Sequence, residues 1–259
     1  MTVRTVAWIS VAPVKGLALR SLQKTTLTEA GAAGDRLFHL IDADGRLVNR
    51  KQEPALAGIE AASDEVGRVL SLVFPDGSVA AGEPAGGETV TTSFYGRPVA
   101  GVVVEGPWSE ALTRWTGRAL RLVRAAPGQA HDRGPKGAVS LVSTGSLDEL
   151  ARAAGSGGSV DERRFRILLG IAGARPHEED GWLGRPVSIG TAVVRPVAHC
   201  GRCAVTTQDP DTGNVTLDTL GLIRVYRGDV ESEEPLPFGV WGEVVTPGQV
   251  RLGDPVLPR

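Results

Sequence analysis

Apolar and polar residues alternate in short runs along the first hundred residues, with the period of two that is typical of half-buried β-strands. The pattern predicts strands over residues 6–11, 37–41, 69–74 and 99–104. Two segments between such runs, DADG at 42–45 and FPDG at 74–77, supply the Asp and Gly that tight hairpin turns need. We therefore expect antiparallel pairing between neighbouring strands.

Helical spacing of apolar residues occurs in two places. The segment 108–115 carries two tryptophans and a leucine at helical intervals, and it predicts a short amphipathic helix. A second helix is expected over 146–154, where Ser146 and Glu149 have capping-box spacing, followed by a flexible GSGGS connector. Strands are expected again at 187–189 and 192–197, and then in a closing β region.

Composition favours a β-rich fold. Of the 259 residues, 34 are Gly and 17 are Pro, whereas aromatic residues make up only 5%. Many short strands joined by tight turns account for these fractions better than a helical bundle does. Hydrophobic residues at 41% and charged residues at 22% provide both a core and a solvated surface. We expect a mostly β, α+β protein with a few peripheral helices.

The charge balance argues against nucleic acid as the main partner, because 28 Lys and Arg against 30 Asp and Glu leave a net charge of −2 without a basic run. No apolar stretch reaches the length of a membrane span, and Pro13 and Lys15 interrupt the apolar run near the N-terminus before it could form a signal peptide. We therefore expect a cytoplasmic monomer that binds neither nucleic acid nor membranes.

Both cysteines lie in one short segment, His199-Cys200-Gly201-Arg202-Cys203. A thioredoxin-like dithiol would need a helix directly after the first cysteine, but β-branched residues and a turn follow Cys203. A structural zinc site would need four ligands, and the chain offers no second CxxC pair. In the third interpretation one thiolate binds a soft metal centre and Arg202 favours the anion. Spacing alone leaves these alternatives open.

A longer motif carries a specific resemblance. The run RCAVTTQDPDTG over residues 202–213 resembles the signature of the MOSC domain family, named for the C-terminal domain of molybdenum cofactor sulfurase. The segments PVKG at 13–16, AGDR at 33–36 and DADGRLVNRKQEP at 42–54 are similar to the β-barrel domain that precedes MOSC in amidoxime-reducing and YcbX-like proteins. On this resemblance we expect a β-rich N-terminal domain over 1–125 and a MOSC β-barrel over 126–259.

The resemblance implies a molybdenum cofactor, molybdopterin with one metal ion, and makes Cys203 the ligand to the metal. A thiolate is the soft donor that such a metal favours. The cofactor carries a phosphate, and its binding residues are expected to be the cations and hydroxyls at matching positions, namely Lys15, Arg36, Ser143, Thr144, Arg166 and Arg202. Asp209 is expected to shape the following turn, with proton relay to a catalytic site as the alternative. Cys200 is expected to be a structural neighbour, or else a resolving thiol.

The activity that the resemblance implies is an oxidoreductase that reduces small N-hydroxylated substrates. Two cysteines cannot hold an iron–sulfur cluster, which takes about four such ligands. We therefore expect a separate electron-transfer protein, a flavin or iron–sulfur reductase, as the partner. The alternative function is a carrier of sulfur or cofactor, in which a Cys203 persulfide or thiolate acts without redox turnover. That alternative gains weight from Ile167 and Leu168, which stand where many relatives carry Pro-Asn.

Overall fold

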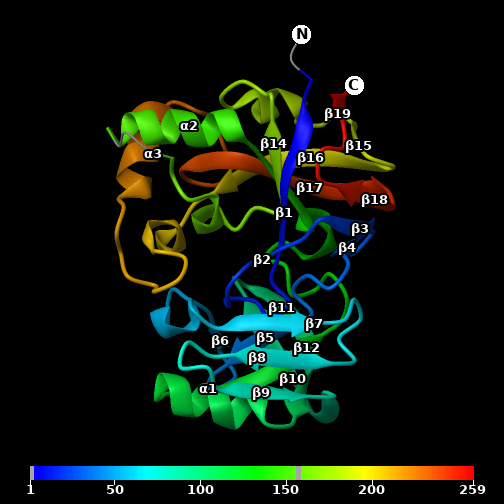
Figure 1. The fold of residues 1–259 in the computed structure, drawn as a ribbon, viewed down its shortest axis with the longest axis vertical. Helices are drawn as coiled ribbons and strands as arrows, with labels where there is room; N and C mark the ends of the chain where they lie inside the picture. Colours follow the sequence, from blue (N-terminus) through cyan, green and yellow to red (C-terminus); the bar gives the residue numbers. More distant parts are fainter. Residues whose placement is uncertain (1–2, 156–158) are drawn as a thin grey trace.

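A large mixed β-sheet forms the upper body of the molecule in Figure 1. The structure, a computed structural model, describes residues 3–155 and 159–259, and within them the strand order of this sheet is β19-β15-β16-β17-β13-β14-β1-β2. Its strands are β1 (Thr5–Val11), β2 (Arg20–Ser21), β13 (Val139–Ser143), β14 (Leu169–Ala172), β15 (Val187–Ile189), β16 (Ala192–Gly201), β17 (Pro237–Thr246) and β19 (Val256–Pro258). Only β13 and β14 run parallel among the strand pairs described. A small sheet of β3 (Lys24–Thr28), β4 (Gly31–Ala32) and β18 (Gly248–Arg251) lies beside it.

The lower body contains two further antiparallel sheets and has its own apolar core. One sheet has the order β10-β11-β12-β5-β6, with β5 (Phe38–Ile41), β6 (Leu47–Val48), β10 (Ala85–Phe94), β11 (Arg97–Glu105) and β12 (Arg121–Ala125). The other pairs β7 (Glu60–Ser63), β8 (Leu70–Val73) and β9 (Val79–Gly82). The helix α1 (Trp108–Thr116) covers this body and buries Trp108 and Leu112. Together the two bodies confirm the predicted mostly β, α+β fold.

The other two α-helices belong to the upper body, and short 3-10 helices lie in both bodies. The helices α2 (Thr144–Ala153) and α3 (Thr219–Arg227) lie against each other at one side of the large sheet (Figure 1). Short 3-10 helices are η1 (Pro54–Leu56), η2 (Gly134–Gly137), η3 (Glu162–Phe165), η4 (Glu178–Trp182) and η5 (Ala204–Thr207). No helix in the described part of the chain is long and apolar enough to cross a membrane.

Strands that are neighbours in a sheet are often far apart in the sequence. The strand β1 pairs with β14, and β3 pairs with β18, so the first thirty residues complete sheets of the upper body. The chain then enters the lower body and returns after β12. The domain boundary near residue 125 stays a prediction, but strand pairing shows that the N-terminal strands hydrogen-bond with strands from the other end of the sequence.

Most predicted elements lie close to observed ones. The predicted strands overlap β1, β5, β8, β11, β15 and β16, and the first predicted helix is confirmed as α1. The predicted capping box of the second helix is wrong, because α2 begins at Thr144 and its N-cap is Ser143, whose hydroxyl accepts a hydrogen bond from the Ser146 amide. The strand β16 extends to Gly201 and so includes Cys200, and α3 was not predicted. Residues 156–158 of the predicted connector lie outside the described residues.

Candidate functional site

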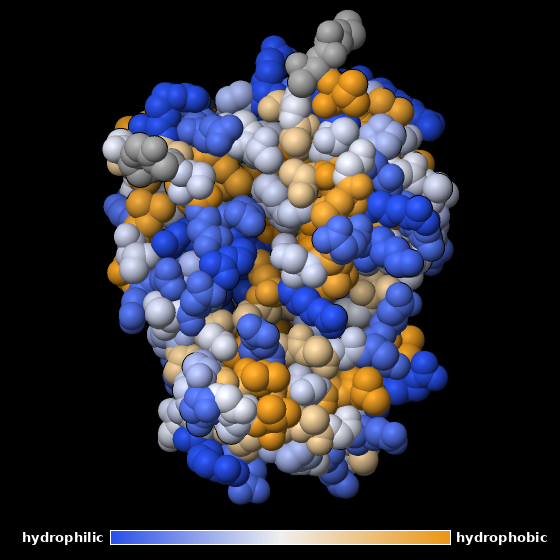
Figure 2. Space-filling model, in the orientation of Figure 1, coloured by the Kyte–Doolittle hydropathy of each residue, from blue (hydrophilic) through white to orange (hydrophobic). Residues whose placement is uncertain are grey.

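A cavity lies between the two bodies, and residues from both of them line it. Hydrophilic side chains gather across the middle of the face seen in Figure 2, where the bodies meet. Five of the predicted site residues line it, namely Lys15, Arg36, Arg166, Arg202 and Cys203. The other lining residues include Gly16, Asn49, Arg50, Lys51, Tyr95, His131, Asp132, Arg133, Ser140, Phe165, Ile167, Cys200 and Trp241. The cavity is therefore built from segments that are far apart in the sequence.

The end of β16 places the two cysteines in different surroundings. Cys200 is on the strand and only 4% exposed, in an apolar cluster with Phe165 and Phe238, and burial raises the pKa of its thiol. Cys203 follows the strand, is exposed, and caps η5 with its backbone. Both thiols are free. The geometry disfavours a thioredoxin-like pair, because Cys200 lies on a strand instead of at a helix N-terminus.

Arg202 is held firmly beside Cys203. Its guanidinium donates hydrogen bonds to the backbone carbonyls of Phe165 and Phe238 and packs over the Phe165 ring at 5.5 Å from the ring centre. Burial lowers the pKa of Arg202, and the nearby cysteines act in the opposite direction. Because the side chain is tied to carbonyls that carry no net charge, its positive charge is free to act on the cavity.

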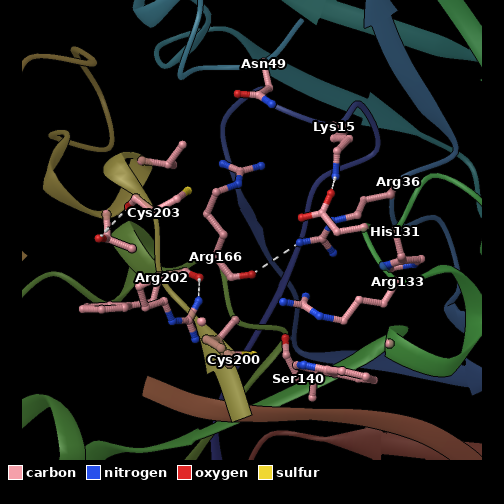
Figure 3. A pocket seen from close by; sticks show the side chains of 18 of the residues that line it. Lys15, Arg36, Asn49, His131, Arg133, Ser140, Arg166, Cys200, Arg202 and Cys203 are labelled. Carbon is pink, nitrogen blue, oxygen red and sulfur yellow. Dashed lines mark hydrogen bonds and ion pairs between the residues drawn. The ribbon is translucent and has the colours of Figure 1, made fainter. Parts of the chain in front are cut away.

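Backbone pairing at the seam between the bodies positions Lys15 and Arg36. The Lys15 amide donates to the Phe38 carbonyl at 2.8 Å, and the Arg36 amide donates to the Ala12 carbonyl at 2.8 Å. The side chains form ion pairs, Lys15 with Asp132 and Arg36 with Asp35. These pairs bring both cations to the same wall of the cavity, opposite Cys203 in Figure 3.

Arg166 rises between these two walls (Figure 3). It ends η3 in the left-handed conformation with φ 53°, which is uncommon for a residue other than glycine. Its buried Nη1 atom has no hydrogen-bond partner in the described residues. Burial, together with the charges of Arg50 and Arg36, lowers the pKa of Arg166 to about 9. A strained backbone and an unsatisfied buried cation at one residue indicate a binding function.

The cavity carries an excess of positive charge. Seven cationic side chains line it, with one carboxylate, Asp132. Three of the cations have ion-pair partners, but within the described residues none is found for Arg50, Lys51, Arg166 and Arg202. Burying a charge without a counter-charge is costly, and an anionic ligand would relieve that cost. The donor set therefore fits a ligand that carries a phosphate.

The side chains of the cavity determine whether it could bind the metal ion of the expected cofactor. Within residues 3–155 and 159–259, no group of three or more His, Cys, Asp or Glu side chains is arranged to hold a metal ion. A metal in this cavity would therefore have to bring other ligands with it. The exposed thiol of Cys203 is the one soft protein donor that the cavity offers to such a centre, since Cys200 is buried in the apolar cluster. The site fits a metal that arrives bound to an anionic organic ligand.

Ser143 and Thr144 lie outside the cavity lining. Ser143 is fully buried, and its hydroxyl caps α2 and donates to the Arg175 carbonyl at 3.1 Å. Ser146 continues this network to Glu179 at 2.8 Å. These hydroxyls join α2 to the segment that leads into η4. The hydrogen bonds give Ser143 a structural role, because a hydroxyl committed to a helix cap and a carbonyl has little left for a ligand.

Asp209 also lies outside the lining, in the turn of the signature motif. Its carboxylate accepts hydrogen bonds from the Asp211 and Thr212 amides and from the Thr212 hydroxyl. The Thr212 amide bond is the main cause of a lowered pKa for Asp209. This geometry matches the turn-forming role that we expected as the first interpretation.

The signature turn also joins the two bodies. Arg50 donates from Nη2 to the Asp209 carbonyl at 2.7 Å, and Gln208 donates from Nε2 to the Arg50 carbonyl at 2.9 Å. Gly213 lies against Pro54 with φ +76°, and a Cβ atom there would be 2.3 Å from the Pro54 carbonyl oxygen. The turn thus holds the segment that carries Cys203 against the lower body.

We expect Gly213→Ala to destabilise the protein more than an equivalent change in open space. The left-handed backbone costs alanine about 1–2 kcal/mol, and the contact with Pro54 adds about 1–3 kcal/mol. Gly77→Ala is the matched control, because Gly77 has φ +83° but nothing within 4 Å of the added atom. Urea unfolding of both variants measures the difference. Equal losses of stability would show that the turn does not pack tightly on the lower body.

Two buried histidines make the folded state sensitive to acid. His39 and His131 are 0% and 3% exposed, and burial lowers the pKa of each to about 3. In the unfolded chain these histidines have an ordinary pKa near 6.5. Because protons bind the unfolded chain first, the free energy of unfolding is highest above pH 6.5 and falls as the pH drops toward 3, by up to about 1.4 kcal/mol per pH unit for each histidine. We expect His131→Gln to lose less unfolding free energy than wild type between pH 6.5 and 4.5. Parallel pH dependence in denaturant unfolding would contradict this.

Sequence reasoning missed Arg50, Asn49 and Tyr95 as lining residues. Arg50 and Asn49 lie within the DADGRLVNRKQEP segment, so the resemblance contained a signal for them. Tyr95 is at the tip of the β10–β11 hairpin, and no motif in the chain marks it.

Comparisons with known proteins show which family the chain belongs to. Among relatives, mitochondrial amidoxime-reducing component 1 of Homo sapiens is 28% identical over 286 residues, covering 98% of this chain and 82% of its own length. Molybdenum cofactor sulfurase of Oryza sativa subsp. japonica is 26% identical over 85% of this chain and 30% of its own. The solved YUAD protein of Bacillus subtilis covers 99% of this chain and 97% of its own, with 13% identity and a TM-score of 0.44. The MOSC N-terminal beta barrel domain matches residues 3–103 and the MOSC domain matches residues 128–257, and the chain therefore belongs to the MOSC domain family.

Proposed function

We propose that this protein binds molybdenum cofactor in the cavity between its two bodies and reduces N-hydroxylated substrates. The observation that carries the proposal is the exposed thiol of Cys203 on the wall of a cavity that contains unpaired buried cations. A thiolate suits the metal, and guanidinium groups suit a phosphate. The names of the two relatives support the same chemistry, one as an amidoxime-reducing component and one as a molybdenum cofactor sulfurase.

Each part of the cavity would have its own task. Cys203 would bind the metal, and Lys15, Arg36, Arg166 and Arg202 would hold the anionic part of the cofactor. When bound, the molybdenum centre supplies two-electron oxygen-atom transfer. Arg202, fixed by backbone carbonyls, would hold its positive charge beside the anionic part of the cofactor. Apolar residues on the lining, Phe165 and Ile167, would limit water around the reacting group.

Reduction of an N–OH group to N–H releases water and consumes two electrons and two protons. The Lys15 ammonium lines the cavity and its Nζ is hydrogen-bonded to Asp132, so this pair is the best placed source of a proton in the lining. The electrons would come from a separate flavin or iron–sulfur protein, because two cysteines are too few for a cluster in this chain.

The test uses protein purified from a host that makes the cofactor and from an isogenic host that cannot. We expect reduction of an aromatic N-hydroxyamidine by a chemical electron donor only with protein from the first host. Full activity of metal-free protein would exclude the proposal. The competing function, a carrier of sulfur on Cys203, is favoured by the exposure of that thiol. Inactive protein with one extra sulfur atom on Cys203 by mass spectrometry would favour the carrier.

A further inference from the structure

Arg50 has no task in the proposed reaction and, unlike Arg133, no ion-pair partner in the described residues. Arg50 is 2% exposed and lines the cavity beside Arg166. Its Nη2 donates to the Asp209 carbonyl at 2.7 Å, but its Nε is buried without a hydrogen-bond partner in the described residues. A buried guanidinium with an N–H group that lacks a hydrogen-bond acceptor destabilises the folded state. Such a group indicates a ligand that accepts a hydrogen bond from it.

The surroundings of Arg50 do not neutralise its charge. Asp209 and Asp211 are close enough to favour the cation, but neither carboxylate forms an ion pair with it. Asp211 is paired with Arg163 through both oxygens, and the Asp209 carboxylate is occupied within its turn. Burial lowers the pKa of Arg50 to about 10, so the side chain is still cationic at neutral pH. The charge of Arg50 is therefore available to a ligand in the cavity.

Arg50 is part of a short wall that the lower body contributes. Lys51 follows it, is exposed, lines the same cavity and has no ion pair in the described part of the chain. Tyr95 stands next to this wall at the hairpin tip, 69% exposed, with φ 52°. An exposed aromatic side chain held in a left-handed backbone conformation is rare and costs about 1–3 kcal/mol. Asn49 and Tyr95 line both this cavity and a second hollow on the surface of the lower body.

Different charged residues surround Arg50 and Lys15. Charges that act on Arg50 come from Asp209, Asp211, Arg163 and Arg164, on the side of the signature turn. Those that act on Lys15 come from Asp132, Arg36 and Arg166, on the opposite side. The charges of both Arg50 and Arg36 act on Arg166, so Arg166 lies between the residues around Arg50 and the residues around Lys15. Arg50 thus lies on the side of the cavity that is nearest to the signature turn.

We infer that Arg50 and Lys51 form an anion subsite that recognises a carboxylate, or a similar planar anion, on the substrate. The inference rests on the proposed function, because it specifies the class of N-hydroxylated compound that the cavity takes. An arginine fork matches a carboxylate with two parallel hydrogen bonds, and the adjacent ammonium adds a second charge. Tyr95 offers the ring of an aromatic substrate a flat surface next to that subsite.

The kinetic test compares two aromatic N-hydroxyamidines that differ at one position, a carboxylate in one and a neutral carboxamide in the other. We expect wild-type protein to prefer the carboxylate in kcat/KM by about tenfold or more, which is the range of a charge-assisted hydrogen bond. In Arg50→Gln the preference falls to within about twofold, and Arg50→Lys restores part of it. Lys51→Gln lowers it too, and because Lys51 is exposed this variant should fold normally.

Control measurements distinguish an anion subsite for the substrate from a role in the fold or in cofactor binding. Lys24→Gln removes an exposed charge on β3, outside the cavity lining, and should leave the preference unchanged. Molybdenum content is measured for every variant. Equal loss of activity toward both substrates in Arg50→Gln and Lys51→Gln, or loss of molybdenum in both, would overturn the inference, since these residues would then support the fold or the cofactor.

A binding measurement keeps the inference independent of turnover. Calorimetry compares the amidine products of the same two compounds on wild type, Arg50→Gln and Lys51→Gln. Tighter binding of the carboxylate by wild type alone supports the subsite, even if no N-reduction is found. Reduction of both substrates without a charge preference, and equal binding of both products, would leave the proposed function intact and overturn the subsite.

Discussion

Replacement of Cys203 by serine is expected to abolish N-reductive activity while the protein stays folded. The thiol is exposed and makes no side-chain contact that the fold depends on, so unfolding free energy should change by less than about 0.5 kcal/mol. The metal would lose its protein thiolate, and activity should fall by more than a hundredfold, because even residues behind metal ligands cost about 10–100-fold. Steady-state assays and unfolding curves on the same preparation measure both effects.

Cys200→Ala provides the comparison for Cys203→Ser. This change removes the buried thiol from the apolar cluster and is expected to lower stability, with the molybdenum content per folded chain retained. The reverse outcome, metal lost from Cys200→Ala and kept in an active Cys203→Ser, would move the metal ligand to the buried cysteine.

Replacement of Arg166 by methionine is expected to change stability and binding in opposite directions. The folded state disfavours the charge of Arg166, since burial lowers its pKa to about 9, well below the ordinary value of an arginine. The unfavourable free energy of burying this charge is complete below pH 9 and decreases as the pH rises above 9. At pH 7 the cofactor-free variant should therefore be more stable by about 1–4 kcal/mol. Cofactor retention should fall, because a cation between the two walls of the cavity is gone.

Chemical denaturation of cofactor-free protein and metal analysis of loaded protein test the two halves of this prediction. Arg195→Met is the control, because Arg195 forms a partly exposed ion pair with Glu243 outside the cavity lining. Such a pair contributes about 0–1 kcal/mol, and its loss should not affect the cofactor. A less stable Arg166→Met with full metal content would show that Arg166 serves the fold and not the ligand.

Much of the fold could be predicted because local patterns decide it. Alternation located β1, β5 and β11, and the spacing of Trp108 and Leu112 located α1. Pairing between distant strands could not be predicted, since nothing local to β1 indicates β14 as its neighbour. The helix α3 was missed although five of its nine residues are apolar, because the signature motif before it ends in a turn and drew the attention to the cysteine segment.

The candidate site was predicted in part, and by resemblance more than by pattern. Lys15, Arg36, Arg166, Arg202 and Cys203 meet at one cavity, although up to 188 positions separate them in the chain (203 minus 15). Ser143 and Thr144 were nominated from their place before a helix, but hydrogen bonds to the fold engage Ser143. Arg50 was not nominated although it lies in the DADGRLVNRKQEP segment that carries part of the resemblance. Tyr95 reaches the cavity because of where the folded chain places the β10–β11 hairpin, and no local pattern in the sequence indicates that position.

The stoichiometry of molybdenum and pterin tests the central claim most directly. Protein is purified from a host that makes the cofactor, and both components are measured per chain for wild type and Arg166→Met. We expect close to one molybdenum and one pterin per wild-type chain, with both reduced in the variant. Wild-type protein that holds neither, from a host in which other molybdenum enzymes are loaded, would contradict it.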